Sequence, residues 1–309
     1  MSVASAGAAR PGLIELIGWS RGRRLLGAAY ALPTLIFVAV FFILPLILVT
    51  VMSASDWPLL TGDRGINLPS NYEALGSGRL FWPAVAFTIQ YTVIVTAILI
   101  GLGLGLALLV QESGRWVGTM RTIFLLPLAV GLASASLLFW GFYSPTIGPL
   151  NPLLQTLGLI DEPIQFLGGP TIALLSTVFL VVWKFAGLYM LILLVGLQAI
   201  PGEIYEAAAI DGASRWQSLR SITLPLLRPA LALALILCVT GSLLAFDQFF
   251  ILTKGGPDNT TVTIVQLIYR EAFQRQNLGT AAALSIVLLV ALLALNLLWF
   301  RTLRRSDGG

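Results

Sequence analysis

Histidine is absent from the 309 residues, and cysteine occurs once, as Cys238 inside an apolar run. A single cysteine rules out a disulfide within the chain, and without histidine we expect neither a zinc site nor a histidine-dependent nucleophile. The sequence also lacks a glycine-rich phosphate-binding loop followed by Lys-Ser or Lys-Thr. We therefore predict no metal site, no catalytic residue and no ATPase activity in this chain.

Charged side chains are scarce as well, at 10% of residues against 57% hydrophobic residues. This balance predicts an integral membrane protein. The net charge of +4 does not indicate a nucleic-acid partner, because the basic residues are spread between apolar runs instead of gathering on one polar surface.

Six apolar runs are each near or above the ~20 residues that cross a bilayer as a helix. The first follows Arg21, Arg23 and Arg24 and is too long for the apolar core of a signal peptide, so we expect it to stay as an anchor. The predicted organisation is a tail at 1–24, a membrane domain at 25–301 and a tail at 302–309. The runs are 25–55, 83–110, 122–143, 171–198, 229–250 and 280–300.

The second run contains Gly101 and Gly105, a pair of small residues four apart. This spacing favours close packing between membrane helices, so we predict a packing face there.

Lysine and arginine are distributed unevenly between the two sides of this six-helix arrangement. Twelve lie on the side of both termini and five on the other, with Lys184 inside the membrane. The positive-inside rule then predicts both termini in the cytoplasm.

Residues 203–229 are the longest polar interruption with helix-forming chemistry. Glu206 to Ala209 favour a short helix, Asp211-Gly212 breaks it, and Ser214 can cap a second helix that Pro225 and Pro229 would end. We predict helix, sharp turn, helix on the cytoplasmic side. An ordinary amphipathic hairpin on the membrane surface is the simplest alternative.

The order of residues in this segment resembles the signature loop of permease subunits in ATP-binding-cassette (ABC) importers, and its carbohydrate branch in particular. Further stretches similar to that branch are 121–127, 148–151, 246–247 and 253–257, with Lys254 where glycine is common. The resemblance implies an all-α fold with six transmembrane helices, a type I importer bundle, and a loop that docks on an ATPase. The loop residues that carry the match are Glu206, Ala207, Ala208, Asp211, Gly212, Ala213, Ile222, Leu224 and Pro225.

The resemblance also implies the partners. These would be a second, non-identical permease, two ATPase subunits holding ATP and magnesium, and an extracytoplasmic solute-binding protein, in the inner (plasma) membrane of a prokaryote. The chain itself would bind no cofactor, and its substrate would be a sugar, oligosaccharide or polyol. The alternatives are an importer of glycerol phosphate or its diesters, a secondary transporter driven by an ion gradient, and a membrane-embedded enzyme.

Two ionisable residues, Lys184 and Asp247, lie inside apolar runs, where a charge is costly enough to suggest a function. Lys184 stands between Trp183 and Phe185, with Tyr189 near. It could hold a sugar beside aromatic rings, or it could snorkel or pair with another subunit. Asp247 could instead anchor a loop at the outer mouth. Gln90 and Trp140 are further candidates for a substrate pathway, although such residues often only join helices.

The outer segments 54–82 and 144–170 are long and rich in turn residues. We expect them to form a shaped surface for a solute-binding protein, or to be plain connectors.

Overall fold

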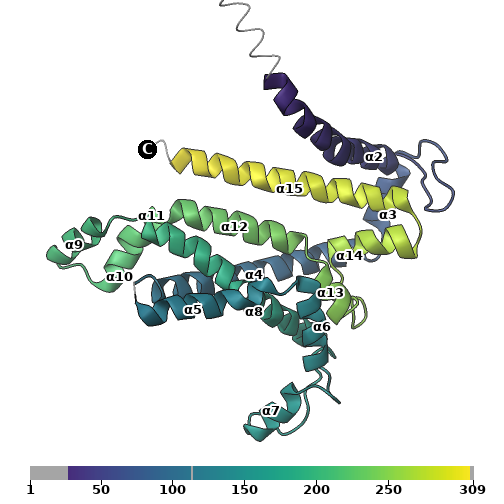
Figure 1. The fold of residues 1–309 in the computed structure, drawn as a ribbon. Coiled ribbons are helices and arrows are strands. Elements are labelled where there is room, and N and C mark those ends of the chain that lie inside the picture. The colour runs from purple at the N-terminus through teal and green to yellow at the C-terminus, as the bar shows by residue number, and fades with distance from the viewer. Residues whose placement is uncertain (1–26, 113, 307–309) are drawn as a thin grey trace, which may run out of the picture.

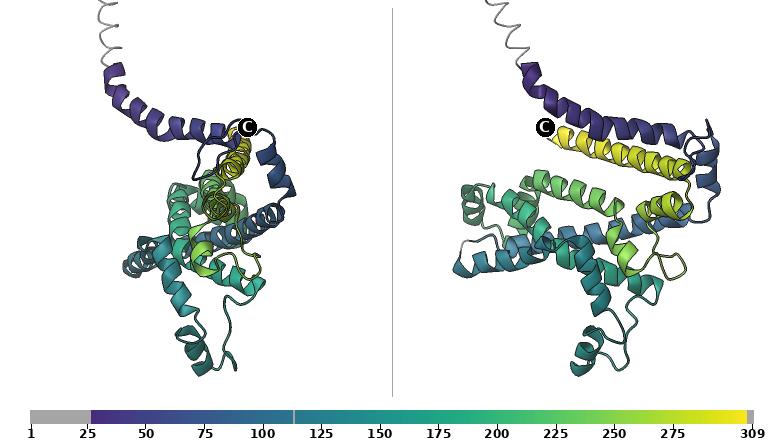
Figure 2. Two further views of the ribbon diagram at one scale, coloured as in Figure 1. Left: turned by 90° about the vertical axis from the view of Figure 1, so that its right-hand side faces the viewer. Right: turned by 45° about the vertical axis from the view of Figure 1, so that its right-hand side comes forward.

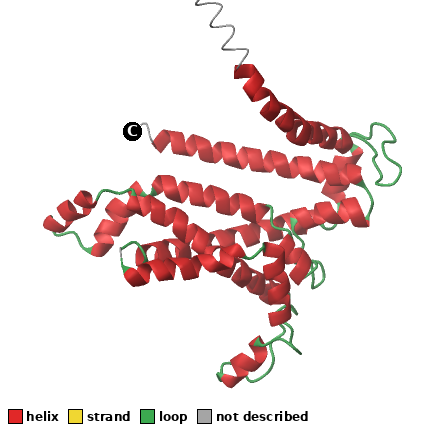
Figure 3. Cartoon of the chain, in the orientation of Figure 1, coloured by secondary structure: helices red, strands yellow, loops and turns green. Residues whose placement is uncertain are grey.

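The structure is a computed structural model that describes residues 27–112 and 114–306. These residues fold into helices joined by loops, with two isolated β-bridges (Figures 1 and 3). The predicted tail at 1–24 lies outside the described residues. The helices that cross or flank the bundle are α2 (Leu44–Ser53), α4 (Phe81–Leu109), α5 (Arg115–Leu125), α6 (Leu132–Phe142), α8 (Pro170–Gln198), α12 (Arg228–Leu243), α13 (Asp247–Leu252), α14 (Ile264–Tyr269) and α15 (Leu278–Ser306).

Five helical spans in the described residues are long and apolar enough to cross a membrane, and a bent pair makes a sixth if it counts as one span. The five spans are Gly27–Ser53, Phe81–Leu109, Pro170–Gln198, Arg228–Leu252 and Leu278–Trp299. The all-helical membrane fold is therefore confirmed. The last helix continues to Ser306, beyond the predicted end of the membrane domain.

The third run is not the single continuous helix that its composition predicted. It consists of α5, a 3₁₀ turn η2 (Leu126–Ala129) and α6, and the two parts meet at 92°. Pro127 lacks an N–H and Gly131 has extended ψ, so the helical ladder stops before α6 begins. The fifth run is interrupted too, between Leu243 and Asp247.

The main core lies where α4 packs along α8. A side chain at Gly103 would lie 2.9 Å from Tyr189 Cβ and 3.1 Å from the Tyr189 carbonyl carbon, so glycine allows the two helices to approach closely. The packing face predicted at Gly101 and Gly105 is not used within the described residues, because neither glycine has an atom near its Cβ position. The close contact with α8 is made by Gly103, on the opposite face of α4.

The first span runs over α15, and its beginning curves away from the bundle (Figure 2). Its end is tied to the helix α3 (Ser70–Ser77), because Asn71 Nδ2 donates hydrogen bonds to the carbonyls of Ser53 and Ser55, at 3.0 and 2.9 Å. Asn71 is buried, so these bonds fix the outer loop to the bundle.

The second long outer segment contains α7 (Leu150–Thr156), which projects away from the bundle (Figure 1). Asn151 closes this segment by donating to the Ile164 carbonyl at 3.0 Å and accepting from the Ile164 N–H at 2.9 Å. Both outer segments therefore carry local structure and are more than simple connections.

Candidate functional site

The hairpin segment, residues 202–227, lies at the same end of the bundle as the C-terminal end of α15 (Figure 1). Its first helix is α9 (Gly202–Ile210). The turn that follows contains Gly212, where φ is +78°. The N–H of Gly212 donates to the Ala209 carbonyl and that of Ala213 to the Ala208 carbonyl, at 3.1 and 2.9 Å. This Schellman geometry needs a left-handed residue, which explains the glycine.

A second helix, α10 (Arg215–Ser218), begins immediately after the turn. Ser214 and Gln217 form a reciprocal capping box, so the predicted cap and the helix–turn–helix order are found in the structure. The predicted stop at Pro225 and Pro229 was wrong. The chain continues through a π-helical turn η3 (Leu219–Thr223) and α11 (Leu224–Leu226) into α12, with each proline in the first turn of its helix, where no N–H is needed.

The two arms of the hairpin segment are joined by a hydrogen bond that sequence reasoning missed. The hydroxyls of Tyr205 on α9 and Thr223 on η3 are 3.0 Å apart, and Thr223 is buried. Nothing in the local spacing of these residues indicates the pairing, since they are 18 positions apart.

The sequence-predicted residues of this segment fall into two groups. Glu206, Ala207, Asp211 and Gly212 are exposed around the turn. The half-buried residues are Ala208, Ala213, Ile222, Leu224 and Pro225. Ile210 and Trp216 flank the turn with 87% and 67% of their surfaces exposed, and their large apolar side chains suit a protein partner.

A cavity of about 340 Å³ lies between α4, α8, α12 and α13. Its size is in the usual range for small-molecule sites. The walls are mainly apolar and aromatic, and Asp247 is the only charged residue in the lining. The aromatic and polar lining residues that indicate a ligand site are Tyr91, Phe185, Tyr189, Phe246, Asp247 and Gln248.

Gln248 gives the cavity its most specific polar feature. Its Nε2 donates to the Tyr91 hydroxyl at 3.0 Å, while its buried Oε1 has no hydrogen-bond partner among the described residues. A buried amide oxygen without a partner is unfavourable, so the position of this side chain costs free energy. The sequence analysis did not predict Gln248 as a site residue, although Gln248 directly follows the candidate Asp247.

The structure brings only two of the six predicted pathway residues to this cavity, Tyr189 and Asp247. Gln90 is exposed on α4. Trp140 lines a separate hollow of about 220 Å³ beneath the outer loop. Trp183 packs against Phe139, with ring centroids 5.2 Å apart.

Lys184 is 4% exposed and does not line the cavity. Its Nζ donates hydrogen bonds to the backbone carbonyls of Leu128, at 3.3 Å, and Val130. Because the ammonium is held inside the chain, the side chain does not snorkel in this conformation.

Comparison with known proteins identifies the family. Residues 97–306 match the binding-protein-dependent transport system inner membrane component family. The chain belongs to this family. The trehalose/maltose transport system permease protein MalF of Thermococcus litoralis is 36% identical over 279 residues, covering 89% of this chain and 92% of MalF. The probable ABC transporter permease protein YurN of Bacillus subtilis is 31% identical over 271 residues, covering 87% and 92%.

A solved structure of this transport family has the same fold. The matching chain comes from the crystal structure of a bacterial alginate ABC transporter in complex with an alginate pentasaccharide-bound periplasmic protein. It is 26% identical to this inner membrane component with a TM-score of 0.82, and the alignment covers 93% of this chain and 96% of that one.

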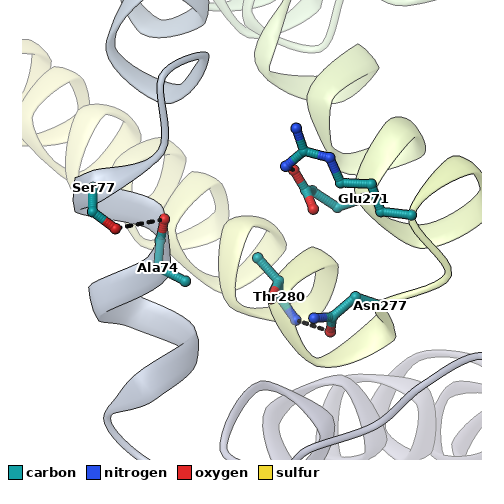
Figure 4. Close-up of polar contacts among 6 residues, drawn as sticks. Ala74, Ser77, Glu271, Asn277 and Thr280 are labelled. Atoms are coloured by element: carbon teal, nitrogen blue, oxygen red, sulfur yellow. Dashed lines mark hydrogen bonds and ion pairs between the residues drawn. The ribbon is translucent and has the colours of Figure 1, made fainter.

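The end of this transport component that lies away from the hairpin segment, called the outer end in the predicted topology, contains a polar pocket of about 310 Å³ between α3, η4 (Arg270–Gln274) and the start of α15 (Figure 4). Glu271 lies in its wall and pairs with Arg275 at 2.7 Å. Burial raises the pKa of the Glu271 carboxyl, and the Arg275 charge offsets only part of this effect. Asn277 caps α15 by accepting from the Thr280 N–H at 3.0 Å.

Lys254, which stands where the carbohydrate permease branch commonly has glycine, has a φ angle of +52°. Its carbonyl accepts from Arg270 Nη2 at 2.8 Å, and this bond helps to hold the loop in a conformation that suits glycine better.

Proposed function

We propose that this chain is one transmembrane subunit of an ATP-driven importer that carries a sugar, oligosaccharide or polyol. The observation that carries the proposal is the hydrogen-bonded pair of Gln248 and Tyr91 in the wall of a cavity lined by aromatic rings. Sugars present apolar C–H faces to rings and hydroxyls to such amides. The substrates of two similar proteins, trehalose/maltose for the T. litoralis permease and alginate for the solved transporter, support the same substrate class.

The charge of the cavity favours a neutral substrate. Asp247 is its only charged residue, and a carboxylate repels the phosphate of glycerol phosphate or its diesters. Lys184 could touch the substrate only if it left the two carbonyls that it binds here. Trp183, Gln90 and Trp140 lie away from the cavity, so any role of theirs in the pathway belongs to another conformation or to a surface shared with a second permease.

The hairpin segment is proposed to dock on the ATPase. Glu206 and Asp211 on the exposed turn offer charge, and Ile210 and Trp216 offer apolar area. Residues 222–225, which are half-buried except for the buried Thr223, connect the segment to α12. ATP binding would close an ATPase pair and turn the bundle outward, and hydrolysis would restore the inward state, each through a difference in affinity for the two conformations.

The assembly would contain this chain, a second non-identical permease, two ATPase subunits and an extracytoplasmic solute-binding protein. The excess of basic residues on the hairpin side supports cytoplasmic termini in a prokaryotic cell membrane. The chain itself is proposed to be non-catalytic and to bind no cofactor, with ATP and magnesium held by the ATPase subunits.

The first test is to tag the chain in its native membrane, purify it in mild detergent and identify the co-purifying proteins by mass spectrometry. We expect a second multi-span subunit and an ATPase. After reconstitution of the complex in vesicles, we expect sugar uptake only when ATP is present on the side of the membrane that the hairpin segment faces. Uptake by the chain alone, driven by a sodium or proton gradient, would instead establish a secondary transporter.

A further inference from the structure

Lys184 lies at the middle of α8, 14 residues after Pro170, and points into the break of the bent pair. A charge at this depth is unfavourable unless it is paired. The only ion pair among residues 27–112 and 114–299 is that of Glu271 and Arg275. Backbone carbonyls, not a carboxylate, therefore compensate the Lys184 ammonium within this chain.

The break supplies carbonyls that need a donor. In a continuous helix the Leu128 carbonyl would accept from the N–H of residue 132 and the Val130 carbonyl from that of residue 134. Here η2 ends at Ala129 and α6 begins at Leu132, so neither bond forms across the bend. Carbonyls at a helix end carry partial negative charge, and an unsatisfied carbonyl in a bilayer is strongly unfavourable.

Gly187 lies three residues after Lys184, on the same face of α8. A side chain at Gly187 would overlap the Phe124 carbonyl group at the end of α5. The absence of a side chain thus lets the backbone of α5 rest directly on α8, one turn from the ammonium that holds the following carbonyls. These two contacts act on the two sides of Pro127.

We infer that Lys184 and Gly187 together form a seat on α8 that fixes the right-angled bend of the third span. Lys184 is a positioning residue for the transport pathway and not a ligand of the substrate. The bend places Leu132, the first residue of α6, in the wall of the cavity. The seat thereby sets one wall of the pathway through backbone contacts.

The bend can be measured directly in the assembled transporter. Nitroxide labels at Thr119→Cys on α5 and Leu138→Cys on α6, both exposed positions, report the distance between the two arms by pulsed electron resonance. The native cysteines, Cys238 included, are first replaced by alanine. Along a straight helix these positions would be about 28 Å apart, and a right-angled bend brings them to about 20 Å.

We expect Lys184→Arg to keep the short distance, because guanidinium also donates to carbonyls, and Lys184→Met to lengthen or broaden it toward the straight-helix value. An unchanged distance in Lys184→Met overturns the inference. If the distance is unchanged and Lys184→Met raises the KM for sugar, Lys184 is a substrate ligand. If it releases the other subunits, Lys184 holds the assembly.

A second pair of variants covers the case in which Lys184→Met does not fold. Gly187→Ala should lengthen the distance while leaving the charge in place, and Gly105→Ala is the matched control, because nothing lies near its Cβ position. Equal distances in Gly187→Ala and Gly105→Ala would overturn the inference. The distance depends on no substrate, so failure of the proposed sugar transport would not be confused with failure of the seat.

Discussion

The amide of Gln248 at the start of α13 donates to the hydroxyl of Tyr91 on α4, at 3.0 Å, across 157 positions of the chain. The pair joins two spans at the wall of the cavity and leaves the Gln248 carbonyl oxygen free of partners in the described structure. One bond therefore fixes the positions of two polar side chains in the wall of the cavity.

Replacing Gln248 with leucine should weaken sugar transport. The substitution keeps the volume but removes the amide that positions the Tyr91 hydroxyl, and one lost hydrogen bond of about 1.4 kcal/mol corresponds to a tenfold rise in apparent KM. Uptake into vesicles by the complete transporter measures it. Gln274→Leu, at an exposed position on η4, is the matched control and should leave KM unchanged. Equal effects of the two substitutions would remove Gln248 from the pathway.

Replacing Gly212 with valine should uncouple the hairpin segment from the ATPase without preventing insertion. A β-branched residue resists φ of +78°, at a cost of about 1–3 kcal/mol, although no atom obstructs its side chain. We expect loss of co-purified ATPase and of transport, with the chain still present in membranes. Gly202→Val at the start of α9 provides the control, since its φ is not positive. Normal transport by Gly212→Val would contradict this account of the turn.

Replacing Gly103 with alanine should destabilise the bundle, whereas Gly105→Ala should not. The added methyl at Gly103 meets the backbone and Cβ of Tyr189, and overpacking of this kind costs about 1–3 kcal/mol. The measurement is the thermal midpoint of unfolding of the purified chain in detergent, monitored by alkylation of the single, buried Cys238. Equal midpoints would show that α4 and α8 can separate without penalty.

The stability of the outer end should fall as pH rises through the titration of Glu271. Its raised pKa means that the folded state holds the proton more tightly than the unfolded state. The folded form is therefore most favoured below the ordinary glutamate pKa, and loses that advantage as pH rises to the raised value. Glu271→Gln should flatten the dependence of the thermal midpoint on pH, while Glu73→Gln on α3 should leave it. A parental slope in Glu271→Gln would contradict the prediction.

The sequence by itself determined the membrane class, most of the spans and the hairpin segment. Apolar runs of bilayer length can form only structures that satisfy their own backbone, so α4, α8 and α15 fall where composition puts them. Asp211-Gly212 and Ser214 encode the turn and the cap locally, because each acts on neighbouring backbone groups. Local signals of this kind need no knowledge of distant contacts.

Only the tertiary structure decided which polar residues share a site. The sequence left Lys184 either as a substrate ligand or as a charge that snorkels or pairs, and only the structure shows its ammonium at carbonyls from a break more than 50 positions earlier. Gly103 and not the Gly101–Gly105 pair meets α8, since the rotation of α4 about its axis is set by packing. Tyr91 and Gln248 meet for the same reason. Helix rotation and the place of a bend depend on the facing surface, which no stretch of the sequence contains alone.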